Sequence, residues 1–131
     1  MGWPEGEDTG SLCPRSDVFA RVLENGERWL SAHQTSPQRA EVLFYTAQAY
    51  ETWWSVVRAP KEDLRVHDQF GPVRAKYVKG AAEALKKAIA YYDELVKLEP
   101  NSKEARRAER HLPRLRRGMD TGQRAFLCTM C

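Results

Sequence analysis

The chain of 131 residues has little cysteine and no long apolar run. Three cysteines are an odd number, so we do not expect a closed disulfide framework. No stretch approaches the ~20 apolar residues that span a bilayer, which excludes a membrane-spanning protein. Eight glycines and seven prolines are too few for a collagen-like chain. Charge of one sign is also scarce: 21 basic and 18 acidic residues leave a net charge of +3, which does not by itself indicate nucleic-acid binding.

What is present is typical of one globular domain, with 42% hydrophobic and 30% charged residues. We predict a flexible tail over 1–15, a domain over 16–117 and an irregular tail over 118–131. The N-terminal residues carry no apolar secretion signal. We therefore expect a cytoplasmic protein, or a periplasmic one if the natural chain begins further upstream.

Apolar side chains recur at steps of three and four along four stretches, which is the spacing of one helix face. No stretch alternates as a strand does. The sequence therefore predicts an all-α fold of four main helices, at about 16–33, 37–58, 73–98 and 102–117. The 73–98 helix is the strongest of these predictions. The architecture and the docking role predicted from the sequence both depend on its being one continuous rod.

Local signals set the predicted helix ends. Ser36 followed by Pro37 indicates a cap and a first helical turn. Asn101 followed three residues later by Glu104 is a reciprocal-cap pattern. Pro113 lies inside the last apolar stripe and should kink or divide that helix.

Two features interrupt the helical pattern. Gly26 lies on the apolar face of the first helix, where it either weakens the helix or permits a close neighbour. Residues 59–72 have proline near both ends and are long for a helix–helix connection. We expect a short helical turn at about 61–67, with Leu64 and Phe70 packed against the helical hairpin.

Two parts of the sequence resemble the tetratricopeptide-repeat family. A shift of 65 positions superposes two helix–turn–helix units. The stretch Ala88-x-x-x-Tyr92-x-x-Leu95-x-x-x-x-Pro100-Asn-Ser resembles the second helix and inter-repeat turn of that family, and Leu43-x-x-Thr46-Ala47-x-x-Tyr50 resembles its first helix. The sequence pattern most resembles the divergent bacterial repeats of outer-membrane assembly lipoproteins and Tol–Pal-associated periplasmic proteins.

The resemblance covers about residues 16–117 and implies stacked antiparallel helical hairpins. Repeats of this kind ordinarily recur every ~34 residues, so the unit over 37–100 is stretched. For function the resemblance implies protein–protein interaction or scaffolding, without a specific ligand. An incomplete set of repeats leaves apolar ends, so a homo-oligomerisation domain of a larger bacterial protein is an alternative.

The last predicted helix carries a basic face. Arg106, Arg110, Arg114 and Arg117 follow at steps of four, four and three, opposite the apolar stripe. Residues 101–124 contain eight basic and three acidic side chains, a local charge of +5. Such a face attracts an acidic peptide, another subunit or phosphate groups, or it simply keeps the domain soluble. Without interleaved aromatic residues, nucleic acid is not expected.

Trp53 and Trp54 are the second candidate for partner binding. Neighbouring helical residues point about 100° apart, so one covered side cannot bury both rings. An exposed ring would anchor an interface, whereas core packing on two sides would hide both. The predicted partner-binding residues are therefore Arg106, Arg110, Arg114, Trp53 and Trp54.

Cys128 and Cys131 form a CxxC pair, whose thiolates could share a metal or form a redox couple. Only Cys13 and His111 could complete a four-ligand zinc site. Ordinary terminal cysteines are the simpler interpretation, so we predict no metal or cofactor. A metal- or redox-responsive module remains an alternative.

No motif indicates catalysis. The histidines are scattered, with no metal-ligand spacing among them, and the acidic pair Glu62-Asp63 stands without a phosphate loop or a nucleophile motif. The same holds for His67-Asp68. We predict a non-enzymatic protein-interaction module with no catalytic residue.

Overall fold

The computed structural model describes residues 16–60, 62–63, 66, 70–71 and 74–120. Among these residues every regular element is a helix, so the all-α prediction is confirmed. The side chains of 16–19, the predicted tail over 1–15 and residues 121–131 of the predicted tail over 118–131 lie outside the description. The helices are α1 (Ser16–Ala32), α2 (Arg39–Arg58), α4 (Arg74–Val78), α5 (Ala81–Leu98) and α6 (Lys103–Arg116).

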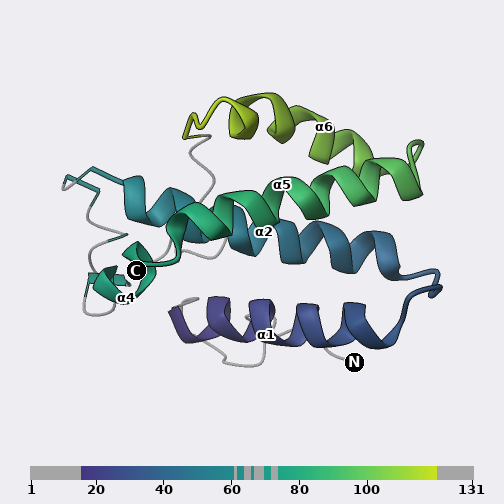
Figure 1. The fold of residues 1–131 in the computed structure, drawn as a ribbon, viewed down its shortest axis with the longest axis horizontal. Coiled ribbons are helices and arrows are strands. Elements are labelled where there is room, and N and C mark those ends of the chain that lie inside the picture. The colour runs from purple at the N-terminus through teal and green to yellow at the C-terminus, as the bar shows by residue number, and fades with distance from the viewer. Residues whose placement is uncertain (1–15, 61, 64–65, 67–69, 72–73, 121–131) are drawn as a thin grey trace.

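The four longer helices run in alternating directions and form stacked layers (Figure 1). α2 and α5 lie side by side and make the most extensive contact, while α1 packs against α2 on one side. α6 packs against α5 and also contacts α2. α2 is therefore the central helix, in agreement with its apolar residues covering more than one stripe.

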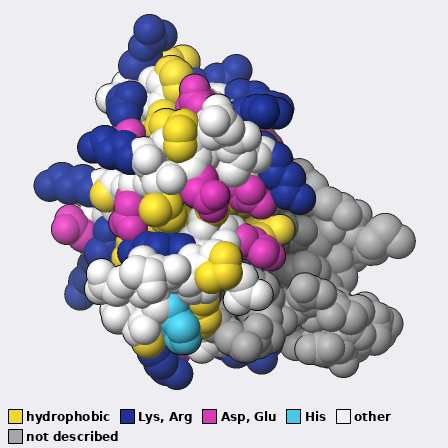
Figure 2. Space-filling view, turned by 90° about the vertical axis from the view of Figure 1, so that its right-hand side faces the viewer, with side chains coloured by type: hydrophobic (Ala, Val, Ile, Leu, Met, Phe, Trp, Pro, Cys, Tyr) yellow, Lys and Arg dark blue, Asp and Glu magenta, His cyan; other side chains and the backbone are white. Residues whose placement is uncertain are grey.

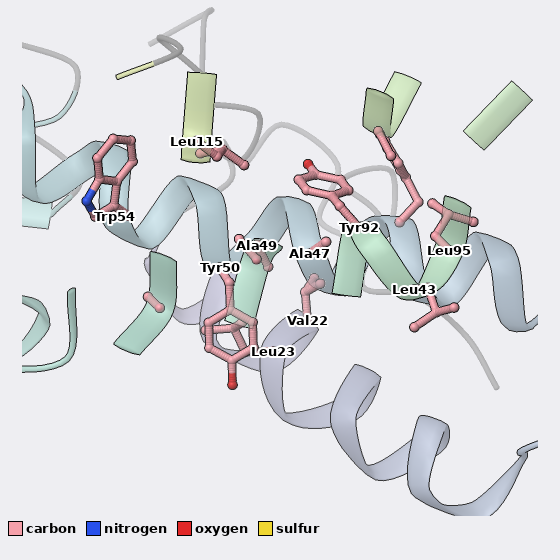
Figure 3. Packing of buried hydrophobic residues seen from close by; sticks show 14 of the residues in the cluster. Val22, Leu23, Leu43, Ala47, Ala49, Tyr50, Trp54, Tyr92, Leu95 and Leu115 are labelled. Carbon is pink, nitrogen blue, oxygen red and sulfur yellow. The ribbon is translucent and has the colours of Figure 1, made fainter. Parts of the chain in front are cut away.

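The core lies on both sides of α2. Its most enclosed side chains include Leu43 and Phe44 of α2, Tyr92 and Leu95 of α5, and Leu115 of α6. Figure 3 shows Tyr50 beside Leu23 of α1, with Tyr92 and Leu115 on the side of α2 away from α1. Because burial of apolar surface is the main favourable term in folding, this shared core holds the layers together.

The prediction of one rod over 73–98 is wrong. The stretch is divided at Lys79 and Gly80 into α4 and α5. The cause lies in α2: the Trp53 indole Nε1 donates a hydrogen bond to the Tyr77 carbonyl at 2.6 Å, an oxygen that in a continuous helix accepts from residue 81. A Cβ atom at Gly80 would lie 2.4 Å from Trp53 Cζ2, so the indole fits only against glycine.

The predicted architecture and docking role both depended on a continuous 73–98 helix, and this helix is broken. α5 nevertheless keeps 18 residues and packs along α2 and α6. The all-helical arrangement therefore stands on α2, α5 and α6, and any docking role must be argued from α6 itself.

The predicted start of the second helix is also wrong by two residues. α2 begins at Arg39, and Gln38 at its N-cap makes no side-chain capping bond. Ser36 Oγ instead accepts a hydrogen bond from the Gln38 backbone N–H at 3.1 Å. Ser36 therefore stabilises the turn before the helix rather than the helix end.

The N-terminal cap of α6 is a different residue from the one that the reciprocal-cap pattern indicated. Ser102 is the N-cap, and its Oγ accepts from the Ala105 N–H at 3.0 Å, so the Asn101 cap was wrong. Pro113 does not divide the helix, which runs through it. Gly118, with φ of 67°, ends it in the left-handed conformation that glycine adopts most readily.

In the connection before α4, Val66 and Phe70 are buried, as predicted for Phe70. Leu64 lies outside the described residues. Within the part of the chain that the structure describes, no helix combines the length and apolar character needed to cross a membrane.

Candidate functional site

The outward side of α6 carries a row of cations. Successive residues of an α-helix turn by about 100°, so five basic residues fall within roughly 80° of one another, directly opposite the buried stripe. All five are exposed. We call this row the basic strip: Lys103, Arg106, Arg110, Arg114 and Arg117. Figure 2 shows dark blue side chains around the upper part of the molecule, where α6 lies.

The other two arginines of α6 do not belong to the strip, because each is committed to packing. The Arg107 guanidinium lies 4.3 Å from the centre of the Phe44 ring, which it covers as a cation–π contact. Arg116 forms an ion pair with Asp93 of α5. These two side chains hold α6 against its neighbours and leave the strip facing away from them.

The middle of the strip has no internal counter-charge. The side chains of Arg110 and Arg114 make no hydrogen bond or ion pair with any residue that the structure describes. Arg106 donates only a long bond, 3.3 Å, to the Asn101 carbonyl. By contrast, basic residues between the helices are paired, such as Arg39 with Glu94 at 2.7 Å. The strip is thus a region of the described surface where several positive charges stand unneutralised along one helix.

α6 is also held by apolar contacts and by a buried polar link to α2. Its inward residues are Ala105, Ala108, Leu112 and Leu115, all buried. His111 Nδ1 lies 3.1 Å from Glu51 Oε2, and the Tyr92 hydroxyl donates to Glu51 Oε1 at 2.7 Å. Burial raises the pKa of Tyr92 far above its ordinary range, and the adjacent Glu51 carboxylate raises it further, so this hydroxyl stays protonated and donates.

Sequence reasoning missed Glu51, which is fully buried in this link. A usable signal was present: Glu51 lies in the helix whose apolar residues cover more than one stripe. A polar side chain on a helix covered from several sides has to be buried and hydrogen-bonded. No single-residue motif marks its partner, His111, which lies 60 positions away.

The tryptophan pair is a core feature. Trp54 is 5% exposed, which agrees with the core-packing interpretation, and its contact with a partner stays a prediction. Trp53 is half-buried and packs edge-on against Tyr77, with 5.3 Å between the ring centroids. With its indole N–H bonded to the Tyr77 carbonyl, Trp53 fixes the junction between α4 and α5.

A second polar cluster joins α1, α2 and α5. Glu27 accepts hydrogen bonds from the hydroxyls of Tyr50 at 2.6 Å and Tyr91 at 2.7 Å, with Lys87 Nζ at 3.4 Å. Burial by itself would raise the pKa of Glu27, but these two hydroxyls and then Lys87 bring it below its ordinary value. The carboxylate is thus held ionised and satisfied by its neighbours.

A cavity of about 430 Å³ opens beside this cluster. Its lining residues are Glu27, Leu30, Ser31, Gln34, Arg39 and Tyr91. Arg39 Nη1 donates to the Leu30 carbonyl at 2.9 Å, while its Nε and Nη2 bind Glu94. Both charged groups of the cavity are therefore engaged in joining helices.

Few of the other candidate residues named in the sequence analysis lie in the described part of the chain. Asp63 Oδ1 accepts from the Val66 N–H at 3.3 Å, which makes it a local cap. In the described part of the chain, no three His, Cys, Asp or Glu side chains gather as metal ligands would. Cys128 and Cys131 lie outside that part, as do Cys13 and His67. The metal or redox alternative for the CxxC pair stays a prediction.

Comparison of the chain with protein-family models, with curated protein sequences and with solved structures gave no match.

Proposed function

We propose that this chain is a non-enzymatic protein-interaction module of tetratricopeptide-like build, and that it binds an acidic partner through the basic strip of α6. The observation that carries the proposal is the set of exposed arginines Arg106, Arg110 and Arg114, of which the last two have no described counter-ion. Unpaired cations that a fold holds in a fixed row favour an anionic partner over bulk water when that partner offers several carboxylates together.

The arrangement of helices supports the tetratricopeptide-like build. α1 and α2, like α5 and α6, are antiparallel neighbours joined by short connections. α2 contacts both α5 and α6, so each hairpin packs on the next rather than standing alone. Stacks of this kind hold their surface residues in place before a partner arrives, which lowers the ordering cost of binding.

The proposal is tested with a triple reversal, Arg106→Glu, Arg110→Glu and Arg114→Glu, and a fluorescein-labelled acidic peptide. An exposed ion pair is worth about 0.5 kcal/mol, so losing three weakens binding roughly 10-fold before repulsion is counted. Fluorescence anisotropy measures the affinity, and circular dichroism checks that the variant stays helical. Binding of the wild type should also weaken as NaCl rises from about 50 to about 500 mM.

The chain offers a matched control. Arg21, Lys79 and Lys86 are exposed on other helices or turns and have no described ion pair. Reversing these three to Glu changes the net charge by the same amount at a different place. If the control loses as much affinity as the strip variant, net charge rather than the strip controls binding, and the proposal is rejected.

A further inference from the structure

We propose that the partner segment is itself an α-helix, which lies along α6 and carries carboxylates at one-turn intervals. This inference rests on the proposed function, since it specifies what binds the basic strip. Its basis is the spacing of the strip, the rigidity of α6 and the acidic residues on both flanks.

The spacing of the strip is that of a helix face. Its five residues follow at steps of three, four, four and three. At 1.5 Å per residue the strip is about 21 Å long, with a cation about every 5 Å. The order of steps is the same in both directions, so a helix of the same acidic pattern is in register whether it lies parallel or antiparallel to α6.

α6 holds this spacing fixed. Ser102 caps its N-terminus, and four apolar residues bury its inner side. Arg107 on Phe44 and His111 on Glu51 add anchors near its middle. Because α6 is fixed at several points, its cations cannot move apart to match a ligand with a different charge spacing. The charge spacing of the partner therefore decides how many charges pair.

An extended acidic segment fits the strip less well. In a strand, side chains on one face repeat about every 6.6 Å, because each residue rises about 3.3 Å. Over the four intervals of the strip an extended chain therefore runs about 5 Å too far, roughly one whole interval. A helix with carboxylates at three- and four-residue steps stays in register along the full length.

The flanks of α6 restrict the width of the partner. Glu104 and Glu109 point about 100–120° to either side of the strip's centre. Figure 2 shows further Asp and Glu side chains across the middle of the molecule, below the region of α6. A broad anionic surface that covered α6 and its surroundings would meet these carboxylates. A single acidic helix is narrow enough to avoid them.

The test compares three labelled peptides of about 18 residues built from Ala, Gln and five Glu. The first places Glu at steps of three, four, four and three, and the second distributes the same Glu around the helix. The third keeps the first spacing but contains two prolines that prevent a helix. The full chain should bind the first peptide at least 5-fold more tightly than either of the others.

The strip variants complete the design. Reversal of Arg106, Arg110 and Arg114 should remove the preference for the first peptide, and the control reversal of Arg21, Lys79 and Lys86 should retain it. A neutral version, with Gln in place of the same three strip arginines, gives the same answer if the reversed chain fails to fold.

One outcome overturns the helical partner alone, and two others overturn both proposals. Equal binding of all three peptides overturns the helical partner but leaves the acidic partner standing. Failure of every acidic peptide to bind overturns both. Tighter binding to vesicles with about 30% phosphatidylserine, or to a DNA duplex of about 20 base pairs, than to the first peptide also overturns both, because the strip would then serve a membrane or a nucleic acid.

Discussion

Replacing Gly26 by alanine probes a close approach between α1 and α2. Gly26 of α1 faces Thr46 of α2, and a Cβ atom added at Gly26 would lie 2.2 Å from Thr46 Oγ1 and 3.3 Å from Thr46 Cβ. Rotating the Thr46 side chain moves its oxygen but not its Cβ atom. With the Thr46 rotamer unchanged, the helices must separate by roughly 1 Å to admit the methyl group, because packed interiors leave no void to receive it. Even after the side chain rotates, the 3.3 Å approach to Thr46 Cβ requires a few tenths of an ångström.

Two effects of opposite sign decide the result. Alanine inside a helix is favoured over glycine by about 1 kcal/mol, which would stabilise the variant. Overpacking a well-filled contact costs about 1–3 kcal/mol. Since the required contact is far below the usual van der Waals distance, we expect the packing cost to win. The predicted net change is a loss of up to about 2 kcal/mol in the free energy of unfolding.

Urea unfolding followed by circular dichroism at 222 nm measures this change. Gly71→Ala is the control, because a Cβ atom there meets no atom within 4 Å. Thr46→Ala should rescue the variant in part. The double variant should therefore lose less free energy of unfolding than the sum of the losses of the two single variants. Stabilisation by Gly26→Ala would refute the reasoning, since it would mean that the helices do not meet at this position.

Three further outcomes follow from the contacts between helices. Glu51→Ala should lower the free energy of unfolding by about 3–5 kcal/mol, because it leaves the Tyr92 hydroxyl and His111 without their partner beside a new cavity. Glu51→Gln should cost clearly less. Equal losses of the two variants in urea unfolding would contradict this link. The folded pKa of Glu27 is lowered, so its stabilising contribution is complete above about pH 4.5 and is lost as the pH falls below that value. The stability gap between wild type and Glu27→Gln should therefore narrow on acidification, and a gap that widens would be inconsistent with it. Gly80→Ala should displace the Trp53 indole and shift tryptophan emission to the red, an effect that Gly71→Ala should not produce.

The errors of the sequence prediction have a common physical origin. The break at Gly80 is caused by Trp53, a side chain of another helix that takes the Tyr77 carbonyl 24 positions away. Apolar periodicity continues through this break, so no pattern within 73–98 reveals it. The burial of Trp54 and the pairing of Glu51 with His111 likewise depend on which helices cover α2.

The candidate site was more accessible to sequence reasoning than the core links. The steps between Arg106, Arg110 and Arg114 place them on one helix side wherever that helix packs. The spacing does not predict that Arg107 packs over the Phe44 ring or that Arg116 pairs with Asp93. Only that difference separates a strip of free cations from a uniformly charged helix.

The sequence alone determined that the chain is helical and that one helix carries a basic row, because both follow from spacing within a single segment. The tertiary structure decided where the predicted 73–98 helix breaks, which carboxylate is buried and which arginines stay unpaired. These features depend on groups that are distant in sequence and meet only after the helices pack. Local periodicity encodes which face of a helix is apolar, but it carries no information on which side chain will lie opposite.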